Sequence, residues 1–403
     1  MRKNKFIIKE VIKKDTLITY NYDVKGDFVK YFWLGEMFNV NYEGINIEQV
    51  PDSIAVIPLV ANVLPIIWLN NAVLVVPEID KDFYDCIKVL RKSYQNMLPM
   101  CKFKGKIKAK KVVNNSFEKK ERVAAFFTGG VDSYSTYISI KDEQPDLITV
   151  WGADIDYENV EGANKVKAFV TDIGKKEKVN NIFVKASVRR FIDNSELEKT
   201  YHSQFNDDWW HAVQHSIGII SLAAPLSYIN GYQKVYFAST YTQADRDARH
   251  VVCASLPEID NNVRYGGVQV VHEGFEKSRM DKVKQICEYA KKKKDLLLHV
   301  CYRSKVGDNC SSCEKCYRTI SAILTEGLDP SKLGFDYNNK KKKEMIEYMM
   351  KQDNSEGLEK ISGLWADIAK NLKSKNKKVL NNFQKDALFL YDIGFIKEEL
   401  KTK

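Results

Sequence analysis

The sequence contains little proline and glycine, with 9 prolines and 20 glycines among 403 residues. Collagen-like, proline-rich and broadly disordered chains need far more of these residues, so those classes are excluded. Long apolar runs are also missing. The most apolar segment, Ile54–Leu69, is shorter than a bilayer requires and is interrupted by two prolines, and the basic start MRKNKFIIKEVIKK lacks the apolar stretch of a secretory signal. We therefore expect a cytoplasmic protein that does not enter a membrane.

Acidic residues are outnumbered by basic ones, 53 against 63, which gives a net charge of +10. This balance suits partners that carry phosphate, although lysine runs such as Lys340–Lys343 are typical of solvated surfaces. A hydrophobic fraction of 44% is enough to build a core. At about 150 residues per domain, the length predicts two or three domains.

The pattern along the chain divides it into three regions. Residues 1–115 predict an N-terminal α+β module, and the lysine-rich segment 102–121 predicts a linker. In residues 116–330 strands alternate with helices, which indicates an α/β fold with a parallel sheet and crossover helices. Residues 331–403 are charged and predict a helical tail. The expected strands are 5–12, 16–22, 53–60, 72–77, 123–127, 147–152, 181–184 and 234–239, and the expected helices are 80–98, 133–140, 161–177 and 208–226.

A glycine turn between a strand and a helix is the strongest chemical signal. Its residues are Thr128, Gly129, Gly130, Val131, Asp132 and Ser133. Glycines expose backbone N–H groups, and the start of a helix adds unpaired donors and a positive dipole end. The hydroxyl groups of Thr128 and Ser133 add further donors. The segment predicts an anion site that is neither a GxxxxGK[ST] nor a GxGxxG motif.

Four of the eight cysteines are close together and have the spacing C-x8-C-x2-C-x2-C. They are Cys301, Cys310, Cys313 and Cys316. Four converging thiolates favour a structural Zn²⁺ site, and an iron–sulfur cluster is the alternative. We expect a strand at Leu296–Val300 to lead into the first cysteine and a helix to begin near the last one.

The TGGVDS segment closely resembles the SGGxDS pyrophosphate loop of the adenine-nucleotide α-hydrolase group, with Thr128 replacing the first serine. Members of that group cleave ATP between the α and β phosphates, adenylate a carbonyl or carboxyl oxygen, and pass the activated carbon to ammonia, an amine or sulfur. The combination of this loop with the four clustered cysteines makes residues 122–327 resemble the 7-cyano-7-deazaguanine synthase family. The gap after Cys301 is slightly longer than in that family, and both flanking regions are additions.

The resemblance implies a Rossmann-like, parallel-sheet core that binds ATP, and it leaves the substrate open. A carboxylate or amide-like oxygen on a modified base, a sugar or a protein would be the acceptor. Members of the family often form dimers, so a homodimer is an expectation. The adenine and ribose would lie beside the end of the second core strand, at Trp151, Gly152 and Asp154.

Two polar segments add candidate residues to this site. The segment Ser239–His250 is expected to be a charged loop, in which Arg246 would neutralise the α-phosphate and carboxylates would hold Mg²⁺. Lys277 and Arg279 would contact the pyrophosphate. The catalytic candidates are therefore Asp132, Ser133, Arg246 and Lys277.

Two histidines and a cysteine have two interpretations each. His211 and His215 are four residues apart without an HExxH motif, so packed or hydrogen-bonded side chains are favoured, although His215 could face the substrate. Cys253 is either a small buried side chain or a covalent nucleophile.

The sequence thus predicts an ATP-dependent carbon–nitrogen ligase that forms AMP and pyrophosphate. A tRNA sulfurtransferase on the same fold is the alternative, as is an ATP-sensing interaction protein without catalysis. Sulfurtransferases of this type usually need a mobile cysteine near the active site, whereas the four clustered cysteines have the spacing of a structural site. The sulfurtransferase, and with it a nucleic-acid partner, is therefore not favoured.

Overall fold

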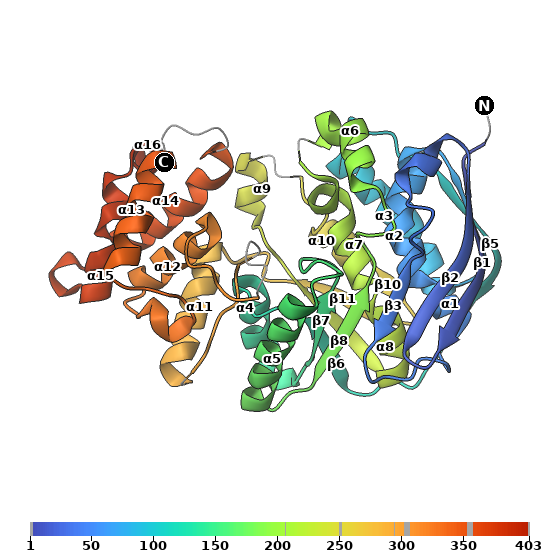
Figure 1. Cartoon of the computed structure of the whole chain (residues 1–403), viewed down its shortest axis with the longest axis horizontal. Helices are drawn as coiled ribbons and strands as arrows, with labels where there is room; N and C mark the ends of the chain where they lie inside the picture. Colours follow the sequence, from blue (N-terminus) through green and yellow to red (C-terminus); the bar gives the residue numbers. More distant parts are fainter. Residues whose placement is uncertain are drawn as a thin grey trace.

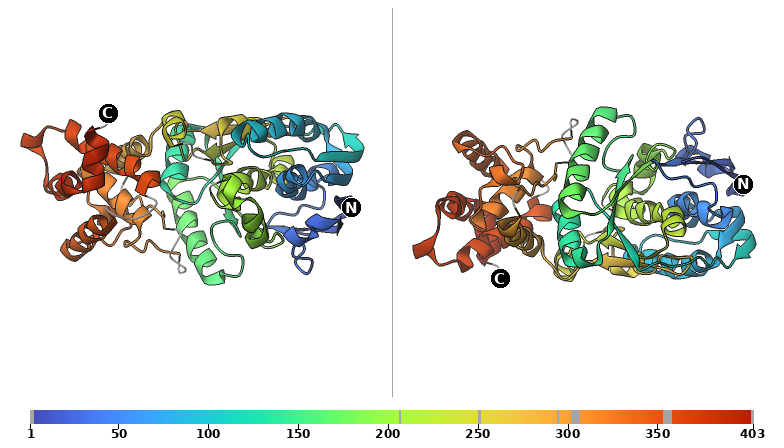
Figure 2. Two further views of the ribbon diagram at one scale, coloured as in Figure 1. Left: turned by 90° about the horizontal axis from the view of Figure 1, so that it is seen from above. Right: turned by 90° about the horizontal axis from the view of Figure 1, so that it is seen from below.

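An eleven-stranded sheet connects the beginning of the chain to its middle (Figure 1). The computed structural model describes residues 3–205, 207–249, 252–293, 295–301, 307–352 and 358–401. The strand order is β10-β11-β9-β6-β7-β8-β3-β2-β1-β4-β5. The sheet lies in the middle and at one end of an elongated molecule, and the C-terminal helices form the other end (Figures 1 and 2).

Five parallel strands form the middle of the sheet, and side chains from both of their faces pack in hydrophobic cores. They are β6 (Arg122–Phe126), β7 (Asp146–Trp151), β8 (Asn181–Ala186), β9 (Tyr232–Ala238) and β11 (Val268–Glu273). In β6, Ala124 and Phe126 belong to one hydrophobic core, whereas Val123 and Ala125 belong to a second core. Successive side chains in a strand point to opposite faces, so this alternation separates the two cores.

Helices cover both faces of these strands. The core on one face contains side chains from α4 (Val131–Ile140), α5 (Val160–Glu177), α11 (Arg279–Lys292) and α12 (Glu314–Thr325). The core on the other face contains side chains from α2 (Ile57–Leu69), α3 (Lys81–Met97), α6 (Asn194–Phe205), α7 (His215–Ile220) and α8 (Ala223–Asn230). The predicted alternation of strands and helices is confirmed, and the sheet is mostly parallel in this region.

The order of the strands reverses beside β6. The chain continues from β6 to β7 and β8 on one side, and then returns to place β9 and β11 on the other side. In open α/β sheets, crevices form at such reversal points, outside the carboxyl ends of the strands.

The N-terminal region extends the same sheet. It contributes β1 (Lys5–Lys14), β2 (Leu17–Lys25), β3 (Asn39–Tyr42), β4 (Val73–Asp80) and β5 (Lys106–Val113). The antiparallel pairing of β3 with β8 joins this region to the parallel strands. The sheet therefore continues across the predicted boundary near residue 115, and the N-terminal residues share a hydrophobic core with β7, β8 and β9.

Four local predictions were wrong. The expected strand 53–60 is helical, in α1 (Asp52–Ala55) and α2, because a short fully buried apolar run has no period that separates strand from helix. The expected linker contains β5, an edge strand whose lysines are mostly exposed and so discourage pairing with another chain. The expected loop 239–250 contains α9 (Gln243–Arg249), while His250 lies outside the described residues. Residues 296–300 form no strand.

The C-terminal tail is helical, as expected, and packs on α12. Its helices are α13 (Asn339–Gln352), α14 (Leu358–Ser374), α15 (Asn382–Asp386) and α16 (Gly394–Lys401). Trp365 Nε1 donates a hydrogen bond to Glu314 at 3.1 Å, and Lys375 forms an ion pair with Glu326 at 2.9 Å. Glu314 begins α12 and Glu326 follows its last residue, so the tail stabilises the helix that carries the last of the four cysteines.

Among the described residues, one helical stretch, Trp210–Asn230, is long and apolar enough to cross a membrane. Of its most apolar window, 78% is buried inside the protein, as in the core helix of a folded domain. The apolar segment singled out from the sequence forms the 13-residue helix α2, which is also buried in the core.

A buried polar network connects α2 to the middle of the chain. Gln214 Nε2 donates to Asn62 Oδ1 at 2.9 Å and to the Val188 carbonyl at 2.7 Å, while Trp209 Nε1 donates to Gln214 Oε1 at 2.9 Å. The side chains of all three network residues are buried. Buried polar groups require such partners, so the network holds the N-terminal region against the parallel strands.

Replacement of Gln214 by leucine is expected to lower the free energy of unfolding by roughly 2 to 4 kcal/mol, because three buried polar groups lose a partner. Chemical denaturation of the full chain measures this loss. The control is Gln243→Leu on the exposed face of α9. Equal stabilities of the two variants would contradict the structural importance of the network.

Candidate functional site

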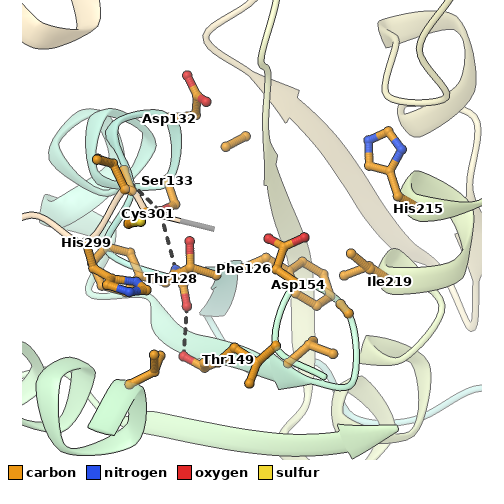
Figure 3. A pocket seen from close by; sticks show the side chains of 18 of the residues that line it. Phe126, Thr128, Asp132, Ser133, Thr149, Asp154, His215, Ile219, His299 and Cys301 are labelled. Carbon is orange, nitrogen blue, oxygen red and sulfur yellow. Dashed lines mark hydrogen bonds between the residues drawn. The ribbon is translucent and has the colours of Figure 1, made fainter. Parts of the chain in front are cut away.

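A cavity of about 390 Å³ opens at the carboxyl ends of β6, β7 and β9, where the strand order reverses (Figure 3). Side chains from Phe126, Ile148, Val150 and Phe237 form an apolar part of its wall. The TGGVDS segment and a group of charged residues form the remainder. The cavity is thus apolar on one side and polar on the other.

The TGGVDS segment presents the start of α4 to this cavity. Gly129 has a φ of +76°, and a Cβ atom there would lie 2.3 Å from Phe169 Cε1, so both the turn and the contact require glycine. Gly130 is the residue before the helix, and it has no side chain that could cap the helix start. The first N–H groups of a helix have no partner within it, so this end of α4 offers donors to an anion.

Ser133 keeps the turn in shape. Its Oγ accepts a hydrogen bond from the Thr128 N–H at 3.4 Å and donates one to the Gly130 carbonyl at 3.2 Å. Phe127, the residue after β6, is also held in place, because Thr149 Oγ1 donates to its carbonyl at 2.8 Å. These hydrogen bonds stabilise the backbone around the start of α4.

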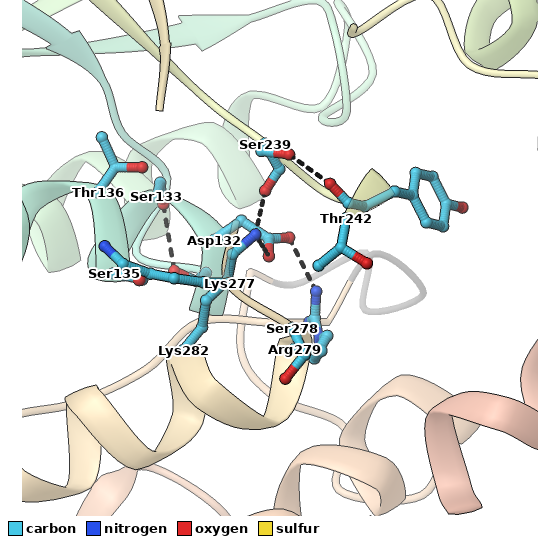
Figure 4. A network of polar contacts seen from close by, with 12 residues as sticks. Asp132, Ser133, Ser135, Thr136, Ser239, Thr242, Lys277, Ser278, Arg279 and Lys282 are labelled. Carbon is cyan, nitrogen blue, oxygen red and sulfur yellow. Dashed lines mark hydrogen bonds and ion pairs between the residues drawn. The ribbon is translucent and has the colours of Figure 1, made fainter. Parts of the chain in front are cut away.

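Basic side chains gather around Asp132 at the start of α4 (Figure 4). Arg279 Nη1 lies 2.8 Å and Lys282 Nζ 3.2 Å from its carboxylate oxygens. Lys282 also donates to the Ser239 carbonyl at the end of β9. Burial alone would raise the pKa of Asp132, but Arg279, Lys282 and Lys315 lower it below its usual value. Asp132 is therefore ionised and anchors the cations beside the helix start.

Two further ionisable side chains line the cavity, and burial affects both. Burial, together with the nearby charge of Arg279, lowers the pKa of Lys315. Burial also lowers the pKa of His299, whose Nε2 is buried without a hydrogen-bond partner in the described part of the chain. The His299 N–H donates to the Gly129 carbonyl at 2.9 Å and so joins the segment before Cys301 to the glycine turn.

Most of the residues expected at the site lie together in this cavity. Its lining contains Thr128, Gly130, Val131, Asp132, Ser133, Asp154 and Arg279, and Gly129 belongs to the same turn. Four other expected residues, Trp151, Gly152, Arg246 and Lys277, lie outside its lining.

Trp151 and Gly152 are turned away from the cavity. Val150 lines it, and the next side chain in the strand, Trp151, faces the opposite direction, where Lys185 Nζ lies 3.9 Å from its ring centroid. Gly152 has a φ of +103°, and a Cβ there would lie 1.9 Å from the Ala186 carbonyl oxygen. It allows the strand to turn and lines a neighbouring cavity.

Arg246 and Lys277 have acidic partners elsewhere. Arg246 lies on α9 and pairs with Glu258 at 2.8 Å. Lys277 lies 3.1 Å from Glu273 and donates to Ser139 Oγ at 2.7 Å. The carboxylates of Asp245 and Asp247 on α9, expected to hold Mg²⁺, accept hydrogen bonds from Thr242 and Gln243 of the same segment.

Sequence reasoning missed Lys282, His299 and Lys315. A single lysine or histidine in a charged sequence gives no specific signal. His299 and Lys315 reach the cavity, and Lys282 reaches Asp132, only through the fold. Lys315 offered one indirect signal, since it lies between Cys313 and Cys316 in a segment already expected to fold around a metal.

The four clustered cysteines converge, as expected. Their sulfur atoms all lie within 4.8 Å of one another, with Cys301 and Cys313 at 4.0 Å and Cys310 and Cys316 at 3.9 Å. Three of the four are buried. The cluster could hold a metal ion, and it adjoins the cavity, because Cys301 is part of the lining and Lys315 projects from the same helix as Cys316.

The two glycines of the turn give a matched pair of variants. Gly129→Ala is expected to destabilise the protein by about 1 to 2 kcal/mol, because alanine is strained at a φ of +76° and its Cβ would overlap Phe169. Gly130→Ala should change the stability far less, since φ there is −75° and the nearest atom to its Cβ would be 3.5 Å away. Thermal unfolding compares the two, and a larger loss for Gly130→Ala would show that the turn has another shape.

Comparison of the chain with models of known protein families found no match. The curated proteins and the solved structures also contain no match to it. The cavity, its glycine turn and its basic side chains therefore provide the basis for the functional conclusion.

Proposed function

We propose that this protein is an ATP-dependent ligase that adenylates a carboxylate or amide-like oxygen, releases pyrophosphate, and transfers the activated carbon to a nitrogen nucleophile. The observation that carries the proposal is the uncapped start of α4, open to a cavity with Arg279 and Lys315 in its lining. A triphosphate needs this combination of backbone donors and positive charge.

The two sides of the cavity suit the two parts of ATP. The glycine turn and the cations would hold the β and γ phosphates, while Ile148 and Val150 offer an apolar surface to the adenine. Asp154 and Asp156 also line the cavity and supply carboxylate oxygens of the kind that Mg²⁺ prefers. In this pose the α-phosphate lies between the turn and the end of β7.

The proposed reaction begins when an oxygen of the substrate attacks the α-phosphorus. The bond between that phosphorus and the bridging oxygen breaks, and pyrophosphate leaves with the bonding electrons. Negative charge moves onto the leaving group, where Arg279, Lys315 and the α4 N–H groups would stabilise it. A nitrogen nucleophile then attacks the activated carbon and AMP leaves.

A second cavity of about 500 Å³ would bind the acceptor. It shares Asp154 and Asp156 with the first cavity, and Arg189 and Asn194 contribute to its wall. Trp33 also lines it and is 52% exposed. An exposed indole and a guanidinium group in the lining of one cavity suit a planar ring that carries a carboxylate. This assignment gives the N-terminal region a function, because Trp33 belongs to that region.

The cations of the cavity provide the test of nucleotide binding. Arg279→Gln is expected to weaken ATP binding about tenfold or more, which corresponds to about 1.4 kcal/mol, since it removes a positive charge at the phosphates. Isothermal titration calorimetry with Mg-ATP measures the change. Arg246→Gln is the matched control, because Arg246 lies outside the cavity lining. Equal effects of the two substitutions would contradict the proposed phosphate position.

The reaction products separate this proposal from other uses of ATP. Turnover should yield AMP and pyrophosphate in equal amounts, whereas ADP and phosphate would refute an adenylating mechanism. An ATP sensor would bind the nucleotide and leave it intact.

We further propose that the four-cysteine cluster holds Zn²⁺, in keeping with four thiolates in a tetrahedral arrangement. Elemental analysis is expected to give about one zinc per chain. Cys313→Ala should lose the metal and several kcal/mol of stability, on the order expected for a structural zinc site. Cys287→Ala, in the same hydrophobic core but outside the cluster, should keep the metal. Iron with a visible absorption band would contradict zinc.

A further inference from the structure

A cysteine and two histidines form a cluster beside the nucleotide cavity. His211 lies in a π-helical turn, Trp210–Gln214, and His215 begins α7. Their imidazole rings are stacked with centroids 5.6 Å apart and an angle of 5° between the planes. The Ala254 N–H donates to the His211 carbonyl at 3.0 Å, which holds Cys253 against this segment. π-Helical turns are frequent at functional sites because they reorient side chains within a helix.

The geometry pairs the thiol with a histidine that is already oriented. Cys253 Sγ lies 4.0 Å from His215 Nε2, and His215 Nδ1 lies 3.2 Å from the Trp210 carbonyl oxygen. A carbonyl accepts hydrogen bonds only, so Nδ1 carries a proton and Nε2 is the nitrogen that can take the proton of the thiol. A nucleophile, a base and a group that orients the base are the parts of a nucleophilic catalytic site.

The second histidine adds positive charge to the same thiol. His211 Nδ1 lies 3.0 Å from a carboxylate oxygen of Asp207. Burial opposes ionisation of Cys253, but hydrogen bonds from His211 and His215 and their charges lower its pKa to about 6. The other ionisable groups that face the cluster are Tyr94 and Tyr241 near the thiol and Asp260 near His215.

The pKa values of the other three cysteines outside the four-cysteine cluster are shifted in the opposite direction. Burial raises the pKa of Cys86 to about 12, that of Cys101 to about 11 and that of Cys287 to about 12. Of these four buried thiols, Cys253 is the one whose pKa is lowered by hydrogen bonds from basic side chains. A structural cysteine needs no such partners, whereas a reactive one does.

The cluster adjoins the cavity through His215. This histidine lines the cavity together with Trp210 and Thr240, across from the glycine turn (Figure 3). Cys253 Sγ lies 4.0 Å from Nε2 of this imidazole and is not part of the lining. Because the thiol is already ionised by its partners, it needs no proton transfer at the moment of attack, and its contact His215 belongs to the cavity lining.

We propose that Cys253 is a catalytic nucleophile that takes the activated carbon from the adenylate before transfer to nitrogen, with His215 as its acid–base partner. This step rests on the function proposed above. The thiolate sulfur attacks the activated carbonyl carbon, the bond from that carbon to the phosphate oxygen breaks, and AMP leaves with the electrons. An amine then attacks the thioester, the carbon–sulfur bond breaks, and a proton of the amine returns to the thiolate through His215.

A metal site is the main competing interpretation of the cluster. Among the described residues, the four clustered cysteines are the group whose ligand atoms converge within 4.8 Å, and Cys253 with its two histidines does not meet this condition. Zinc analysis of the full chain nevertheless decides the question. About one zinc per chain agrees with the nucleophile, and a second zinc that is lost in Cys253→Ser overturns it.

Alkylation of the full, unmodified chain with iodoacetamide tests the reactivity directly. Peptide mass spectrometry follows Cys253 and, as an internal control, the buried Cys287 over a range of pH. Cys253 should react at least about 100-fold faster at pH 7, with a half-maximal rate near pH 6 where its thiolate forms. His215→Asn should move the half-maximal pH upward, because one of the two basic partners is lost.

Equal rates for the two cysteines, or an unchanged pH profile in His215→Asn, would overturn the proposal. ATP binding to the same preparation, measured by calorimetry, separates the two proposals. An unreactive Cys253 in a chain that binds ATP refutes the nucleophile and leaves the ligase intact. A reactive Cys253 in a chain that does not bind ATP refutes the adenylate as its target.

Discussion

The ion pairs of Asp132 with Arg279 and Lys282 are the interaction on which the rest of the site depends. The carboxylate lies in the first turn of α4, and both cations come from α11, so the pairs connect two helices that pack against each other on one face of the sheet. Without the carboxylate, several positive charges would repel one another beside the positive end of a helix dipole. Asp132 therefore allows Arg279 and Lys282 to lie close together near the start of α4.

The sheet determines where these charged side chains lie relative to the cavity. The reversal of strand order beside β6 creates a crevice at the carboxyl ends of the strands, and the glycine turn leads directly out of β6 into it. The two flanking regions contribute from opposite ends of the molecule (Figure 2). The N-terminal region supplies Trp33 to the neighbouring cavity, while the tail packs on α12, which carries Lys315 and Cys316. The fold thus brings the glycine turn, Trp33 and Lys315, which are far apart in the sequence, to two neighbouring cavities at one edge of the sheet.

The features that could be predicted from the sequence are those encoded locally. The glycine turn and the cysteine spacing each lie within a short segment, so their geometry follows from backbone rules, and the cysteines do converge. The strand β7 was located correctly, but the side-chain alternation places Val150 rather than Trp151 in the cavity. Lys277, the expected phosphate contact, and Lys282 both lie near the start of α11, and only the packing of that helix on α4 determines that Lys282 reaches Asp132 while Lys277 pairs with Glu273. His299 and Lys315 meet the turn through long-range contacts that no local pattern encodes.

The position of the nucleotide is the central claim, and a crystal structure of the full chain with Mg²⁺ and α,β-methylene-ATP, which resists cleavage between the α and β phosphates, tests it most directly. The account predicts β- and γ-phosphate oxygens at hydrogen-bond distance from the N–H groups at the start of α4, with Arg279 and Lys315 beside them and the adenine against Val150. A nucleotide bound elsewhere, or triphosphate groups turned away from the glycine turn, would contradict it.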